Sequence, residues 1–240
     1  MKKVLLLTDN YDLLLRFKKL VADNEVGDCF HYAYSPNNKF FRERYKDVDW
    51  IKSIIVKNNI NFLYTNYDLI ISLHCKQIFP KELIKKTRCI NIHPGLNPNN
   101  RGWYPQVFSI INGLPCGATI HEIDEELDHG PIICQKEVKI EMWDTSLSAY
   151  NKILDAEIEL LTNNFENIIY NKYKTVVKED GNLNLKKDFD LLCEIDLSQK
   201  DTYNNMINKL RALTHGKYEN AYFKDDDGNR IFVKLELRKE

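Results

Sequence analysis

The sequence predicts an α/β fold with a mostly parallel central sheet, followed by a small C-terminal extension with a helix and a β-hairpin. Short apolar runs alternate with amphipathic stretches as far as Tyr170, a pattern typical of alternating strands and helices. The composition of the 240 residues, 43% hydrophobic and 29% charged, is that of a globular chain. Beyond Lys178 the chain becomes polar and turn-rich before a final helical pattern and two short strand patterns.

The first expected elements follow one another as strands and crossover helices. Segment 4–8 is almost continuously apolar, as expected of a strand buried on both faces. Segment 11–22 has an apolar stripe with Lys and Arg opposite, which predicts a helix. Segment 89–93 is a strand pattern that Pro94 ends. The expected strands in this part are 4–8, 27–34, 68–72 and 89–93, and the expected helices are 11–22, 48–57 and 80–84.

The next part adds two strands and a long helix. Strands 117–123 and 131–140 flank the acidic segment 124–130, and helix 146–170 has a continuous apolar face. A turn-rich loop at 97–102 and a helix at 103–111 are expected before them.

A polar turn at 179–182 predicts two domains, 1–178 and 179–240. The smaller domain is expected to contain a helix at 201–213 and a hairpin with strand residues 221–223 and 231–237 around an Asp-Gly turn. Because an isolated hairpin is marginally stable in water, it must pack on its own domain or on a second subunit.

Charge and cysteine usage limit the location and the partners. The 34 basic and 35 acidic residues nearly cancel, whereas a dedicated nucleic-acid binder usually carries a basic excess. Apolar runs stay far below the roughly 18 residues that a membrane span needs, and Val4–Leu7 is too short for a secretory signal. The six cysteines form no C-x-x-C pair, which favours reduced thiols. We therefore expect a cytoplasmic protein that binds neither nucleic acid nor membrane.

Several common site motifs are missing from the sequence. There is no G-x-G-x-x-G after the first strand, no G-x-x-x-x-G-K-[ST], no G-x-S-x-G and no H-E-x-x-H. A nicotinamide enzyme, a P-loop NTPase and an α/β-hydrolase are therefore disfavoured. The histidines also lack metal-ligand spacing with the cysteines, which argues against a structural zinc site.

Asn91 and His93 stand at the carboxyl end of an expected buried strand. Alternation along a strand directs these two side chains to the same face, and ligands of open α/β sheets bind beyond the carboxyl ends of the strands. A structural histidine at a strand end is the alternative interpretation. Asp128 lies in the turn between two expected strands, which can return its carboxylate to this edge, although acidic loops are commonly only solvated.

Together these residues carry a family resemblance. Asn91-x-His93-Pro94, then 117–121 (Gly-Ala-Thr-Ile-His), then Asp128-x-Gly130-Pro131-Ile132-Ile133 resembles the signature of the 10-formyltetrahydrofolate-dependent formyltransferases. The resemblance covers most of residues 1–175, and it implies a Rossmann-like catalytic domain in which Asn91, His93 and Asp128 are the catalytic residues.

Subgroups of the family differ in features that this sequence can be compared with. Glycinamide ribonucleotide enzymes have a Gly- and Ser-rich loop where this chain has 8–11 (Thr-Asp-Asn-Tyr), and methionyl-tRNA enzymes are longer, with an RNA-binding domain that the net charge of -1 does not suit. Segment 72–80, loop 99–105 and the short tail are similar to sugar N-formyltransferases. The implied substrate is a dTDP-linked amino-deoxysugar, dTDP-4-amino-4,6-dideoxyglucose above others, for O-antigen or lipopolysaccharide synthesis.

The implied reaction is acyl transfer from the co-substrate N10-formyltetrahydrofolate to a neutral amine, without a metal. Asn91 and His93 would donate hydrogen bonds to the oxygen of the tetrahedral species, and Asp128 would orient His93 and take up the amine proton. Neither Ser nor Cys stands beside the motif, so nucleophilic catalysis has no candidate.

Binding residues follow from the same resemblance and from side-chain chemistry. The pterin is expected at 73–78 and 123–128, where backbone groups in an apolar slot would bind it. Lys76 and Arg101 could bind a diphosphate, and Trp103 or Tyr104 could stack on a base, although each residue could equally be solvated or structural. The expected cofactor-binding residues are Leu73, Cys75, Ile78, Ile123, Asp124 and Leu127, and the expected substrate-binding residues are Asn10, His74, Lys76, Arg101, Trp103 and Tyr104.

Alternatives remain at this point. The acceptor could be another amine such as glycinamide ribonucleotide, water could replace the amine, or the chain could be a folate-binding protein without turnover. A homodimer through the C-terminal hairpin is a further expectation.

Overall fold

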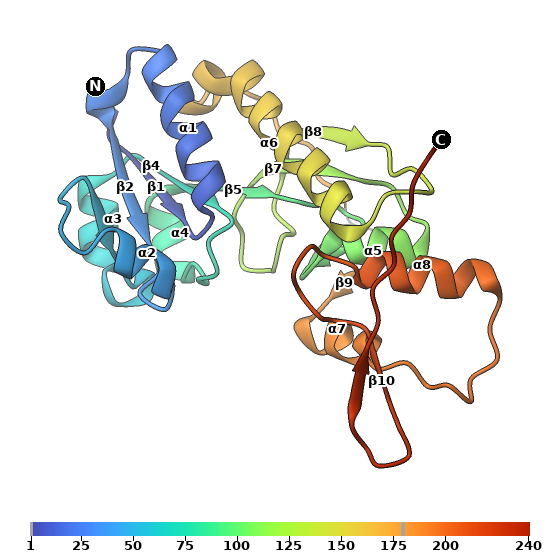
Figure 1. Ribbon diagram of the computed structural model, residues 1–240. Helices are drawn as coiled ribbons and strands as arrows, with labels where there is room; N and C mark the ends of the chain where they lie inside the picture. The colour runs from blue at the N-terminus through green and yellow to red at the C-terminus, as the bar shows by residue number, and fades with distance from the viewer. Residues whose placement is uncertain (1, 179–180) are drawn as a thin grey trace. The chain divides into compact units, whose positions relative to one another are not determined.

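The computed structural model describes residues 2–178 and 181–240. Within these residues a seven-stranded sheet has the order β3-β2-β1-β4-β5-β7-β8 (Figure 1). Strands β1 to β5 pair in parallel, and β7 runs antiparallel to β5. The predicted mostly parallel sheet is therefore confirmed. In sheet order the strands are Ile51–Ser53, Phe30–Tyr34, Val4–Thr8, Leu69–Leu73, Arg88–His93, Cys116–Glu122 and Ile132–Val138.

Helices cover this sheet and continue into the C-terminal part. Asn10 begins α1, since its side-chain oxygen accepts a hydrogen bond from Leu13 N at 3.1 Å. The described α-helices α1 to α8 are Tyr11–Asp23, Lys39–Arg44, Ile60–Asn66, Lys81–Lys86, Pro105–Asn112, Ser146–Ile169, Lys186–Cys193 and Tyr203–Leu213. Short strands β6, β9, β10 and β11 are Arg101–Gly102, Leu183–Asn184, Tyr222–Lys224 and Arg230–Phe232. Among the described helices, none combines the length and the apolar character that crossing a membrane requires.

The chain forms two compact units, each with its own core. Unit 1 comprises the described residues within Met1–His93, Thr119–Gln135 and Glu157–Glu179, and unit 2 those within Pro94–Ala118, Lys136–Ala156 and Asp180–Glu240. Unit 2 includes segments 94–118 and 136–156 as well as the C-terminal part, so its bounds differ from those of the predicted domain 179–240, which stays a prediction.

The central strands of unit 1 build its core. All five residues of β1 and all five of β4 are buried, as expected of parallel strands with helices on both faces. One cluster of the core joins Leu5 and Ile70 of these strands to Leu63 of α3 and Leu83 of α4. This packing fixes where the strands end and therefore where their terminal polar residues lie.

Unit 2 has a core between α5 and α8. Val107 and Phe108 of α5 pack with Ala212 and Leu213 of α8, and Ala221 at the base of the hairpin joins them. The hairpin is also bound to the second residue after α7, since Ile195 N donates to Tyr222 O at 2.7 Å. The hairpin thus packs on its own unit, one of the two possibilities expected for it.

Segment 48–57 differs from the prediction, because it is not a helix. Ile51–Ser53 is the edge strand β3, paired with β2, and Val56–Asn58 is a 3₁₀ turn. The pairing of Ile51 with Tyr32 determines the structure here, and local periodicity does not contain that long-range term. Predicted strand 27–34 begins later, at Phe30, after a 3₁₀ turn. Helices α2, α3 and α7 were not predicted. The expected turn at 179–182 lies in part outside the described residues.

Candidate active site

Strand β5 ends at the point where the sheet changes from parallel to antiparallel pairing. On one side β4 pairs with it in parallel, and on the other side Asn91 lies opposite His121 of β7 and His93 opposite Thr119. His93 and His121 are 3% and 2% exposed, so both imidazoles lie in the protein rather than in solvent. The edge therefore gathers an amide and two imidazoles from two adjacent strands.

Asp128 reaches this edge through the loop between β7 and β8. Its backbone is left-handed, with φ of 49°, a conformation that Asp tolerates better than most residues. Gly130 packs so closely on Glu122 that a Cβ would stand 1.9 Å from the Glu122 carbonyl oxygen. Within the loop, His129 Nδ1 lies 2.7 Å from Asp124 Oδ2. These contacts fold the acidic segment back on β7.

The three predicted catalytic residues converge on the Asp128 carboxylate. Asn91 Nδ2 donates to Asp128 Oδ1 at 2.9 Å, and His93 Nδ1 lies 3.5 Å from Asp128 Oδ2. The Asp128 side chain is 10% exposed. With Nδ1 directed at the carboxylate, the His93 ring presents Nε2 on its opposite side. A carboxylate, an imidazole and an amide in this arrangement can hold and move a proton beside a polarised carbonyl.

His121 is a fourth polar member of the cluster, and we did not predict a role for it in catalysis. Its Nε2 lies 3.8 Å from Asp128 Oδ1 and 3.4 Å from Asn91 Nδ2, while its Nδ1 lies 2.7 Å from the Glu122 carbonyl oxygen. A carbonyl only accepts hydrogen bonds, so His121 carries a proton on Nδ1 and turns Nε2 to the cluster. The alternation of β7, which sends His121 and Thr119 to the same face, is the sequence feature that points to it.

The predicted pterin-binding residues lie in segments 73–78 and 123–128 of unit 1. Leu73 is fully buried in β4, so only its backbone could contact a ligand, whereas Ile123 packs on the unit 1 core and is half-buried. Burial raises the pKa of the Cys75 thiol to about 12, which makes it an inert, protonated group. Ile78 and Leu127 are exposed, 83% and 46%. Asp124 is bound to His129, as described above.

Three predicted substrate residues of unit 1 have structural contacts of their own. The Asn10 side chain caps α1, and His74 Nε2 lies 2.8 Å from Oε1 of the buried Glu157. Lys76 has an exposed side chain, and its backbone N donates to Asp9 Oδ2 at 3.1 Å. The contact with Glu157 occupies one ring nitrogen of His74, and the substrate roles of Asn10, His74 and Lys76 stay predictions.

The other predicted substrate residues, Arg101, Trp103 and Tyr104, belong to unit 2. Tyr104 has left-handed backbone, φ 53°, and its ring packs on Phe189 with centroids 4.1 Å apart. Trp103 N donates to Asn184 O at 2.9 Å. Arg101 Nε is buried and has no acceptor among the described residues. Tyr104 therefore has a packing contact of its own, and the substrate roles of Arg101, Trp103 and Tyr104 stay predictions.

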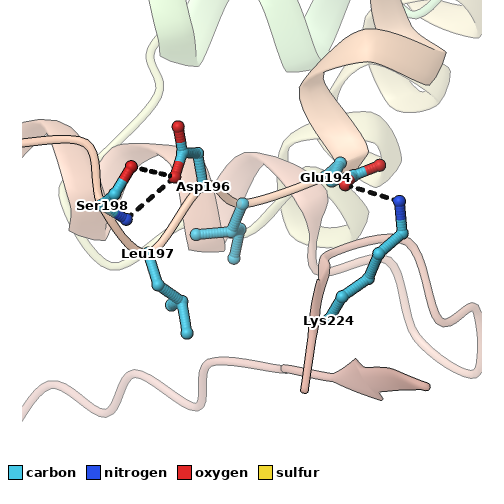
Figure 2. A pocket seen from close by; sticks show the side chains of 6 residues that line it. Glu194, Asp196, Leu197, Ser198 and Lys224 are labelled. Atoms are coloured by element: carbon cyan, nitrogen blue, oxygen red, sulfur yellow. Dashed lines mark hydrogen bonds and ion pairs between the residues drawn. The ribbon is translucent and has the colours of Figure 1, made fainter. Parts of the chain in front are cut away.

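Unit 2 also has a surface hollow, and none of the predicted site residues is among the residues that line it. It is lined by residues from Glu194 to Ser198 and by Lys224, with an ion pair between Glu194 and Lys224 at 2.8 Å (Figure 2). In residues 2–178 and 181–240, no group of three or more His, Cys, Asp or Glu residues is arranged to hold a metal ion.

Comparison with known proteins agrees with this geometry. The formyl transferase family matches residues 35–164, and the N-formyltransferase dimerization C-terminal domain matches residues 188–239. The dTDP-4-amino-4,6-dideoxyglucose formyltransferase of Mycobacterium tuberculosis is 50% identical over 187 residues, which are 77% of this chain and 80% of that protein.

Two solved structures are similar over the whole chain. A 4-N formyltransferase from Francisella tularensis superposes with a TM-score of 0.95 at 44% identity, and a sugar N-formyltransferase from Shewanella with 0.94 at 42%. Each comparison covers 100% of this chain and 99% of the other.

Proposed function

The chain belongs to the formyl transferase family, and we propose that it transfers the formyl group of N10-formyltetrahydrofolate to the 4-amino group of dTDP-4-amino-4,6-dideoxyglucose. It is a folate-dependent N-formyltransferase. The observation that carries the proposal is the cluster of Asn91, His93 and Asp128 around one carboxylate, in a chain 50% identical to a relative with that activity.

In the proposed reaction the neutral amine nitrogen attacks the formyl carbon. The negative oxygen of the tetrahedral species would accept hydrogen bonds from His93 Nε2 and from the second hydrogen of Asn91 Nδ2, the first being donated to Asp128. One such donor contributes about 10²–10³ in rate. Asn91 Nδ2 lies 3.4 Å from His121 Nε2, so the Asn91 amide would have to turn away from His121 to donate to this oxygen.

Proton movement completes the reaction. Asp128, directly or through water, would accept the proton that the amine loses, and a proton would reach N10 as the C–N10 bond breaks. The products are the N-formyl sugar nucleotide and tetrahydrofolate. Asp128 also holds the His93 ring through Nδ1, which directs Nε2 at the reacting carbonyl.

The acceptor is tested by incubating the protein with N10-formyltetrahydrofolate and one amine at a time. We expect tetrahydrofolate release to be fastest with dTDP-4-amino-4,6-dideoxyglucose, slower with its 3-amino isomer and slowest with glycinamide ribonucleotide. Faster release with glycinamide ribonucleotide would overturn the sugar assignment, and release without any amine would indicate hydrolysis.

We also propose that the product, an activated sugar donor, is used for surface glycan synthesis in the cytoplasm and that the enzyme is a dimer. The match of a dimerization domain to residues 188–239 supports the dimer.

In the hairpin, Ile231 and Phe232 are 41% and 43% exposed, an apolar surface that a second subunit could cover. Ile231→Glu with Phe232→Glu should halve the mass measured by sedimentation, with Met142→Glu, an exposed apolar site outside 188–239, as control. An unchanged mass rejects the hairpin interface.

A further inference from the structure

The segment after β4, residues 74–78, is held by polar side chains of unit 1 that lie outside the catalytic cluster. The Asp9 carboxylate accepts from Lys76 N at 3.1 Å and from Ser35 N at 3.0 Å. Gln77 donates to Ser35 Oγ at 3.0 Å and accepts from Val56 N at 2.9 Å. These bonds tie the middle of the segment to the ends of β1 and β2.

The beginning of the segment is held from α6 by Glu157. The His74 Nε2 atom lies 2.8 Å and 3.0 Å from the two carboxylate oxygens of Glu157, which is completely buried. Burial raises the pKa of the Glu157 carboxyl, and His74 opposes that rise. A buried carboxylate is costly in free energy, and an apolar residue of similar size would pack on the core face of α6 at lower cost. The pair is therefore weak evidence for a contribution to stability.

His74 also has an unusual backbone. Its φ of 55° is left-handed, a conformation that is unfavourable for a residue other than glycine. The turn that it makes starts directly after Leu73, which pairs with Ile92 of β5. Glu157 thus fixes a strained turn one residue beyond the strand pairing, beside the strand end that carries His93.

We propose that Glu157 is a positioning residue, which holds segment 74–78 through His74 in the conformation that binds the formyl-folate. This inference rests on the proposed function, since it takes 73–78 as part of the folate site. Glu157 has no contact with the reacting atoms, so its loss should weaken folate binding more than it slows the chemical step.

Three variants separate the contact from the turn. Glu157→Leu removes the acceptor, Glu157→Gln keeps an oxygen that can accept from His74, and His74→Gly keeps the left-handed turn but removes the imidazole. We expect Glu157→Leu and His74→Gly to raise KM for N10-formyltetrahydrofolate about tenfold, with kcat within about threefold. Glu157→Gln should stay near wild type.

The matched control is Asp144→Asn in unit 2, which removes another buried carboxylate, one paired with Lys152 at 2.5 Å. It should lower stability without a change in KM for the folate. An unchanged KM in Glu157→Leu, or an equal rise in Asp144→Asn, overturns the positioning role. Wild-type KM in His74→Gly would mean that the turn alone matters, which also overturns it.

A second measurement does not depend on the acceptor. Hydrogen exchange of the Lys76 amide, which donates to Asp9, reports the order of the segment directly. Faster exchange in Glu157→Leu than in wild type and in Asp144→Asn supports the positioning role, and unchanged exchange rejects it. If wild type binds no tetrahydrofolate by calorimetry, the proposed function fails, whatever the exchange result.

Discussion

Two loops of this chain share left-handed backbone and a closely packed glycine, but different contacts hold them in place. Loop 123–130 of unit 1 and loop 97–104 of unit 2 each contain a left-handed residue that is not glycine, Asp128 at φ 49° and Asn100 at φ 50°. Each also contains a glycine packed against backbone. A Cβ on Gly130 would stand 1.9 Å from Glu122 O, and one on Gly102 would stand 2.4 Å from Asn184 O.

The two loops differ in what holds them. Contacts with carboxylates hold the first, through His129 with Asp124 at 2.7 Å and Lys81 with Glu125 at 2.6 Å. Amides hold the second. Asn100 Oδ1 accepts from the side-chain amides of Asn112, Asn182 and Asn184 at 3.0, 2.8 and 3.2 Å.

Loop 123–130 therefore presents a carboxylate at the catalytic cluster, whereas loop 97–104 buries the polar side chain of Asn100. The first loop holds the Asp128 carboxylate where it can take part in the reaction. The Asn100 side chain, by contrast, is 1% exposed, and its hydrogen bonds stabilise the fold. Substitutions in the first loop should therefore change kcat, and those in the second should change stability.

The largest effect is expected for Asp128→Asn. The amide keeps the shape but cannot accept the amine proton, so kcat should fall about 10²–10⁴-fold. Tetrahydrofolate affinity, measured by calorimetry, should change little. Glu126→Gln is the control, since Glu126 is an exposed carboxylate in the same loop, and it should keep full activity. Normal turnover of Asp128→Asn would remove Asp128 from the mechanism.

Gly130→Ala tests whether the loop must pack on β7 to act. Because the new Cβ meets a backbone carbonyl, the loop has to move, and we expect kcat to fall about 100-fold. Gly27→Ala is the control, since a Cβ there has nothing within 4 Å. Equal kcat in the two variants would show that the position of Asp128 is not set by this contact.

Asn100→Ala tests the second loop. It removes the buried acceptor shared by three amides, of which Asn112 is exposed and Asn182 and Asn184 are half-buried, so the free energy of unfolding should fall by about 1–3 kcal/mol in urea titrations. The exposed Asn204→Ala should have no such effect. If Arg101 binds the diphosphate, KM for the sugar nucleotide should also rise while kcat is kept. A loss of kcat with full stability would contradict the division between the loops.

The sequence could predict the first loop far better than the second. Asn91, His93 and Asp128 belong to one sequence signature, and their residue types indicate hydrogen-bond donation and proton transfer. The end of β5 and the loop after β7 bring the three side chains together. The contacts of Asn100 join residues 82 positions apart, and asparagines have no motif that marks them as a network.

The same reason explains the misses elsewhere. The contact of His74 with Glu157, 83 residues away, was not predicted, because Glu157 has no mark in the sequence beyond its place on a helix. Segment 48–57 was assigned to a helix because its pairing with β2 is a long-range term. Local apolar patterns predicted the central strands well, since burial on both faces makes them continuous runs.

The smallest expected effect concerns pH and belongs to unit 2. His215 Nδ1 lies 3.0 Å from Ser146 Oγ, which accepts from Gln106 Nε2 at 3.2 Å, so a neutral imidazole that accepts from the hydroxyl satisfies all three groups. Burial lowers the pKa of His215 below its ordinary value of 6.5. Between the folded and the unfolded pKa the unfolded chain binds more protons, so stability should fall as the pH drops below about 6.5.

His215→Gln removes that titration and tests its sign. The difference in free energy of unfolding between pH 7.5 and pH 5.5, measured in urea, should be smaller in the variant than in wild type. Activity at pH 7.5 should be kept, because His215 takes no part in the Asp128 cluster. A steeper loss of stability at low pH in the variant would mean that protonated His215 stabilises unit 2.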